Sequence, residues 1–109
     1  MASTQQVAEL FQGIVSRFDV SKAAGINAAI QFDLQGDGGG MHWLKITDDN
    51  IQHGEGAVDS PKMTLKASAD DFAGMLTGEV NPMQAFMTGR IKIQGDTGLA
   101  LKLMPLING

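Results

Sequence analysis

The sequence predicts an α+β fold, in which a five-stranded, largely antiparallel sheet carries its helices on one face. Three observations predict this class. Five short segments alternate apolar and polar residues, as strands with one buried face do. The segments around them have helical spacing or helix-cap residues. The length of 109 residues allows one core, so residues 1–109 are expected to form a single domain.

The chain is expected to open with an amphipathic helix. Ser3 and Gln6 have the spacing of a capping box. Residues 19–25 then predict a short turn or helical linker, and Gly25 suits the left-handed conformation that ends a helix. The apolar residues at helical spacing are Val7, Leu10, Phe11, Ile14 and Phe18.

Four strands are expected next. Residues 27–35 and 41–47 form a hairpin, and residues 51–55 extend it to a meander. Residues 62–67 alternate again and predict a fourth strand. The glycine-rich run 36–40 is interpreted as a hairpin loop, because it lacks the Lys-Ser/Thr ending of a phosphate-binding loop.

Two short helices, a strand and a last helix complete the chain. Ser68 is expected to cap the first short helix, and Asn81, followed by a proline, caps the second. Residues 90–94 alternate and predict the fifth strand. A final helix is expected over residues 97–104, with Pro105 as its stop.

Composition excludes several classes of function. The formal net charge of −4 argues against nucleic acid, because such binding depends on neutralising phosphates. Without cysteine the chain has no disulfide, thiol nucleophile or cysteine metal ligand. No apolar run approaches the ~20 residues that cross a bilayer, and no targeting signal is recognisable. We therefore expect a cytoplasmic protein.

No residue pattern indicates catalysis. The two histidines, His42 and His53, lie in predicted strands without the partners that a metal or an acid–base site needs, and we interpret them as structural. The turn 95–98 opens a helix, but a simple cap is commoner there than an anion site. We expect no catalytic residue, no metal and no cofactor.

Apolar residues concentrate in the last third of the chain. The methionines there suit a surface that adapts to several ligands, although filling a core explains them equally well. In the run 99–107 only Lys102 is charged, so a helix there must bury two faces. The second face could meet the chain's own helices, another subunit or an apolar ligand.

Most of the basic residues on predicted strands are expected on the outward face of the sheet. The simplest interpretation is a solvated strand face. The alternative is transient contact of this face with anionic membranes or an acidic partner. The residues are Lys45, Lys62, Lys66, Arg90 and Lys92.

The order of these motifs resembles the sterol carrier protein type 2 family over nearly the whole chain. The resemblance rests on residues 30–34 before a glycine-rich turn, on residues 42–46, and above all on residues 63–72 and the ordered series over 78–103. It implies a hydrophobic tunnel for fatty acids, fatty acyl-CoA, phospholipid or sterol, with transfer or presentation of the lipid and no turnover. The implied tunnel residues are Phe72, Met75, Leu76, Met83, Phe86, Met87, Ile91, Ile93, Leu103 and Met104, followed by Trp43 and Phe32.

Within this set, Phe32 and Ile93 are expected to belong to the core. The chain lacks the peroxisomal tripeptide of some relatives, so the resemblance favours a free-standing bacterial member or a cytosolic variant, for which sterol is a doubtful ligand. An alternative function is an accessory or dimerisation module that packs its C-terminal apolar helix on a partner enzyme. A monomer or weak dimer is expected.

Overall fold

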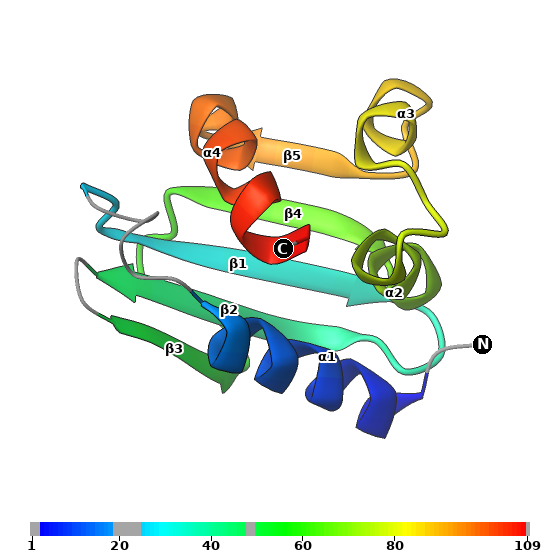
Figure 1. Cartoon of the computed structure of the whole chain (residues 1–109), viewed down its shortest axis with the longest axis horizontal. Coiled ribbons are helices and arrows are strands. Elements are labelled where there is room, and N and C mark those ends of the chain that lie inside the picture. The colour runs from blue at the N-terminus through cyan, green and yellow to red at the C-terminus, as the bar shows by residue number, and fades with distance from the viewer. Residues whose placement is uncertain (1–2, 19–24, 48–49, 109) are drawn as a thin grey trace.

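The computed structural model describes residues 3–18, 25–47 and 50–108, and the described side chains end at residue 102. The helices lie over one face of a five-stranded sheet (Figure 1). The α+β class predicted from the sequence is confirmed. The strands are β1 (Ala28–Gln35), β2 (Gly40–Thr47), β3 (Asn50–Glu55), β4 (Met63–Ser68) and β5 (Lys92–Gly95). The helices are α1 (Thr4–Arg17), α2 (Ala69–Thr77), α3 (Pro82–Met87) and α4 (Thr97–Asn108).

The strands lie in the order β3-β2-β1-β4-β5. All neighbours are antiparallel except β1 and β4, which are parallel. Ile30 of β1 pairs with Leu44 on one side and with Met63 on the other. The predicted meander and the largely antiparallel sheet are therefore confirmed, with one parallel pair in it.

The parallel pair requires the chain to return from the end of β3 to the start of β4. Gln31 of β1 anchors this return. Its amide nitrogen donates to the carbonyl oxygens of His42 at 2.8 Å and Gly56 at 2.9 Å, and its Oε1 accepts the Val58 N–H at 2.8 Å. Gln31 alternates with inward residues and so points away from the helices, yet it is buried. The return segment therefore covers part of the outer face.

The face of the sheet toward the helices carries the core. Alternate residues of the strands point inward and are buried. Phe11 of α1 links the two layers, since its ring centroid lies 5.2 Å from that of Phe32 and 5.0 Å from that of Phe72. The largest fully buried side chains of the described residues are Phe11, Phe32, Phe72, Ile14, Ile30, Leu44, Ile46, Ile91 and Val7.

The predicted caps set where the helices begin and end. Ser3 Oγ accepts the Gln6 N–H at 3.1 Å at the start of α1. Ser68 Oγ accepts the Asp71 N–H at 3.0 Å at the start of α2. Gly78 ends α2 in the left-handed conformation, with φ at 87°. Because α2 follows β4 directly, that strand fixes where the helix lies on the sheet.

Two expectations about the C-terminal third are wrong. Helix α4 continues past Pro105, because a proline removes only its own backbone donor and disfavours a helix without forbidding it. Strand β5 begins at Lys92 and not at Arg90. The N–H groups of Arg90 and Ile91 both donate to the Ala85 carbonyl oxygen, at 2.9 and 3.2 Å, so these two residues belong to the turn after α3.

Candidate functional site

The candidate site lies at one corner of the sheet, where α2, α3 and the start of β5 come together (Figure 1). Helix α2 forms its inner wall. Phe72 and Met75 of this helix are buried, and Leu76 packs against the core while remaining partly exposed. This face of α2 presents only apolar side chains to the interior, as a site for an apolar ligand requires.

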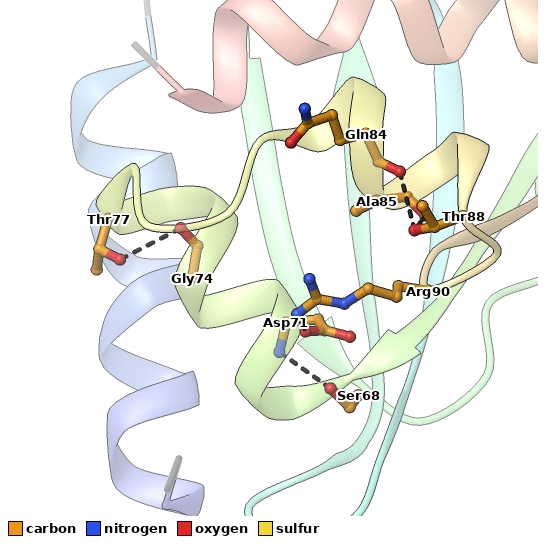
Figure 2. A network of polar contacts seen from close by, with 8 residues as sticks. All are labelled: Ser68, Asp71, Gly74, Thr77, Gln84, Ala85, Thr88 and Arg90. Atoms are coloured by element: carbon orange, nitrogen blue, oxygen red, sulfur yellow. Dashed lines mark hydrogen bonds and ion pairs between the residues drawn. The ribbon is translucent and has the colours of Figure 1, made fainter.

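Helix α3 forms the outer wall and is fixed at both ends by local hydrogen bonds. Asn81 Oδ1 accepts the N–H groups of Met83 at 2.9 Å and Gln84 at 3.2 Å, and Pro82 occupies the first turn. At the other end, Thr88 Oγ1 donates to the Gln84 carbonyl oxygen at 2.9 Å (Figure 2). These bonds define the helix without tying it to the sheet.

The apolar side chains of α3 mostly face solvent. Ala85 is its only buried residue. Met83 is 50% exposed, Phe86 41% and Met87 77%. Helix α3 therefore presents an apolar surface that no described part of the chain covers.

Two links hold the corner together. The Val80 N–H donates to the Gly74 carbonyl oxygen at 3.0 Å, and a Cβ on Gly74 would lie 2.5 Å from Val80 Cγ2. Only glycine permits this approach of the connecting segment to α2. The second link is an ion pair from Arg90 to Asp71, which reaches from the turn after α3 to the first turn of α2 (Figure 2).

Two surface hollows flank the turn after α3. One has a volume of about 550 Å³, which lies in the range of small-ligand pockets, and its mainly apolar surface includes Val80, Ala85 and Met87 beside the charged Glu79 and Arg90. The other has a volume of about 400 Å³ and a basic lining that includes Lys66 and Lys92. Arg90 borders both hollows. The corner therefore joins an apolar recess to a basic one.

The structure divides the expected tunnel residues into groups. Those that are buried in the interior are Phe32, Phe72, Met75 and Ile91. Those that are partly buried against it are Leu76 and Ile93. Those that lie exposed on α3 are Met83, Phe86 and Met87. The side chains of Leu103 and Met104 lie outside the described residues.

Trp43 does not join the interior, contrary to its place among the expected tunnel residues. It alternates with the inward His42 and Leu44, so it lies on the outer face. There it pairs with Gly54 of β3, where an added Cβ would lie 2.1 Å from Trp43 Cζ2. The indole therefore covers the glycine on the face opposite the helices.

The basic residues are less uniformly placed than expected. Lys45, Lys66 and Lys92 lie on strands at outward positions. Lys62 precedes β4. Arg90 does not lie on a strand as expected, because it precedes β5, and its guanidinium pairs with Asp71 of α2. The outward basic face is thus smaller than the alternation predicts.

The two histidines form a hydrogen-bonded pair that the sequence pattern does not predict. His42 Nδ1 lies 3.0 Å from His53 Nε2, and the ring centroids lie 4.6 and 4.5 Å from that of Phe11. Burial lowers the pKa of both, and His42 lowers the pKa of His53 further, while Glu55 opposes both shifts. His42 lies two residues before the apolar Leu44, so the alternation in the sequence already indicates that His42 points inward. Its contact with His53 follows only from the register between β2 and β3.

Two features are not found within the described ranges. No cluster of three or more His, Cys, Asp or Glu side chains there could hold a metal ion. No helix of that part of the chain is both long and apolar enough to cross a bilayer.

The chain matches the model of the SCP-2 sterol transfer family over residues 8–108. It belongs to this family, in agreement with the resemblance in its motifs. A curated relative, hydroxysteroid dehydrogenase-like protein 2 of Bos taurus, is 40% identical over 92 residues, which are 83% of this chain and 21% of that protein. The chain thus spans about a fifth of the length of such relatives.

Solved structures show the same fold. Palmitated SCP2L2 from Aedes aegypti superposes with a TM-score of 0.77 at 19% identity, covering 98% of this chain and 96% of that one. The sec-alkylsulfatase Pisa1 from Pseudomonas sp. gives 0.76 at 16% identity, covering 88% of this chain but 15% of the sulfatase. Family and fold together support lipid binding or transfer as the general class of function.

Proposed function

We propose that this chain binds one apolar lipid between α2 and the sheet and transfers or presents it without chemical turnover. The observation that carries the proposal is the family match joined to the α2–α3 corner, where a buried apolar interior borders an apolar hollow. The interior side chains Phe72, Met75 and Ile91 would contact the ligand, and Met87 would lie at its entrance.

The proposed ligand carries a long acyl chain, as fatty acids, fatty acyl-CoA and phospholipids do. Each buried methylene contributes about 0.8 kcal/mol, so a long chain supplies affinity with few polar contacts. The methionines of α2 and α3 can adapt to chains of different length. Sterol is the least favoured candidate, because a rigid ring system gains less from adaptable side chains.

No catalytic residue belongs to the proposal. The described groups best placed for acid–base chemistry, His42 and His53, hydrogen-bond to each other and stack on Phe11 of α1. A second proposal keeps the accessory role, and it rests on Leu101 of α4, which is 61% exposed, and on the greater length of the relatives. The cytoplasmic location and a monomer or weak dimer remain part of the proposal.

Native mass spectrometry of the freshly purified protein tests the proposal, followed by denaturing extraction and lipid identification. The expected result is an acyl lipid at about one per chain. A ligand-free mass, together with no uptake of a fluorescent fatty acid, would refute lipid binding. A mass that doubles with protein concentration while no lipid is bound would favour the accessory or dimerisation role.

A further inference from the structure

The first observation is an apolar tip on α3, formed by Met83, Phe86 and Met87. Met87 has the largest exposed fraction of any large apolar side chain among the described residues, and the other two are at least two-fifths exposed. Scattered exposed apolar residues are ordinary, but three on a six-residue helix form a patch that marks an interaction surface.

The second observation is the basic hollow beside this tip. Lys66 and Lys92 lie directly opposite each other on β4 and β5, and like charges in that position cost stability. Arg90 adds a third cation. Asp33 lies opposite Lys66 across β1 and β4, Asp71 pairs with Arg90 and Glu79 lines the adjoining hollow, but no carboxylate lines the basic hollow itself. The lining of this hollow is therefore basic within a chain whose formal charge is −4.

The tip and the hollow form one continuous surface. Gly89 turns the chain between them with φ at 82°, so Met87 ends α3 on one side and Arg90 begins the approach to β5 on the other. Arg90 borders both hollows of the corner. Apolar side chains flanked by exposed cations are the pattern of segments that bind at the surface of anionic membranes.

We infer that this corner is where the chain docks on anionic phospholipid membranes. The α3 tip enters the headgroup region, and Lys66, Arg90 and Lys92 face the lipid phosphates. The inference rests on the proposed function, because docking there places the apolar hollow against the bilayer from which a lipid would enter. On this inference the membrane contacts only the α3 corner, and not the whole outward face of the sheet that the basic residues in the sequence suggested.

Flotation with vesicles of phosphatidylcholine, with and without phosphatidylglycerol, tests the inference. We expect binding to the anionic vesicles and little to the neutral ones. Lys92→Gln should weaken that binding about fivefold, as the loss of one cation near an anionic surface predicts. Met83→Gln combined with Met87→Gln should weaken it at least as much, and these exposed positions leave the fold intact.

Two matched controls lie outside the corner. Lys45→Gln removes an outward cation from β2, and Leu101→Gln removes an exposed apolar side chain from α4. Both variants should bind anionic vesicles within twofold of the unchanged protein. An equal loss for Lys45→Gln and Lys92→Gln would overturn the corner in favour of the whole sheet face. Loss for Leu101→Gln alone would move the contact to α4.

A fluorescent label gives a second readout. The chain has no cysteine, so Met87→Cys carries the only thiol for an environment-sensitive dye. Its emission should shift to the blue on anionic vesicles, whereas a dye on Gln52→Cys, an exposed position of β3, should not shift. No shift at position 87, or a shift only when a second protein is added, would refute membrane docking and indicate a protein partner.

The two proposals can fail separately. If the purified protein carries lipid but the anionic vesicles neither bind it nor shift the dye, the docking inference fails and lipid binding stands. If it carries no lipid and takes up none, yet the corner variants abolish vesicle binding, lipid carriage fails and the docking surface stands.

Discussion

His42 Nδ1 lies 3.0 Å from His53 Nε2 where both rings stack on Phe11 of α1, so one ring donates the hydrogen bond and the other accepts it. Two protonated rings would place two N–H groups against each other. Burial also lowers the pKa of both histidines below the ordinary value of 6.5. The hydrogen bond between the two rings therefore stabilises the folded state only while no more than one of the two facing nitrogens carries a proton.

The first prediction concerns pH. In the unfolded chain the two histidines take up protons near pH 6.5, whereas in the folded chain they do so only at lower pH. The contribution of the pair to stability is therefore fully present above that value and is lost as the pH falls below it. The melting temperature should therefore be lower at pH 5.5 than at pH 7.5. Replacing both His42 and His53 by Gln should flatten this dependence between the two pH values. An unchanged slope in the double variant would assign it to the carboxylates.

The second prediction separates ligand binding from folding. Phe86 is one of the implied tunnel residues and is 41% exposed on α3, so Phe86→Glu should keep the fold. It should weaken uptake of a fluorescent fatty acid at least tenfold, since a charge beside an apolar ligand is costly. Phe72→Ala should instead lower the free energy of unfolding by about 3–5 kcal/mol, because Phe72 is fully buried. Urea denaturation and dye binding measure the two effects. Uptake that survives Phe86→Glu would remove Phe86 from the residues that contact the ligand.

The third prediction concerns the contact of Gly74 with Val80. Gly74→Ala places a Cβ 2.5 Å from Val80 Cγ2, so it should destabilise the protein by about 1–3 kcal/mol although alanine favours helices. Adding Val80→Ala removes the obstructing methyl groups and should recover much of that loss. A double-mutant cycle by urea denaturation measures the coupling. Additive effects would argue against the close packing of this segment on α2.

The fourth prediction concerns Gln31. Gln31→Leu removes three hydrogen bonds, two to Gly56 and Val58 in the segment that leads into β4 and one to His42 of β2, and leaves these backbone groups without their partner. The free energy of unfolding should fall by about 1–3 kcal/mol. Hydrogen exchange at Val58 should speed up more than exchange within α1. Uniform acceleration across the sheet would indicate a general loss of stability instead.

Local signals predicted most of the elements. The hydroxyl of Ser3, the hydroxyl of Ser68 and the amide of Asn81 each bind the N–H groups that their cap positions require, because capping depends only on neighbouring residues. The parallel pairing of β1 with β4 could not be predicted from the sequence. The alternation of apolar and polar residues indicates which face of the sheet a residue lies on, and not which strand lies beside it.

The candidate site was only partly predictable for the same reason. Helical spacing in the sequence groups Phe72 and Met75 with Phe86 and Met87 as apolar residues, and only the tertiary structure separates the buried pair from the exposed one. The family resemblance implies a place for Trp43 in the tunnel, whereas the pleat of β2 places it on the other face. Family resemblance carries no information about such an individual side chain.

The place of β4 beside β1 also determines the order in which the sheet can be completed. Strands β1, β2 and β3 follow one another closely in the sequence, so they can pair while the rest of the chain is still being synthesised. During that time β1 has one open edge of unpaired backbone groups, which is the kind of edge that recruits strands from other molecules. Only after residues 56–62 have crossed and β4 has paired does that edge close.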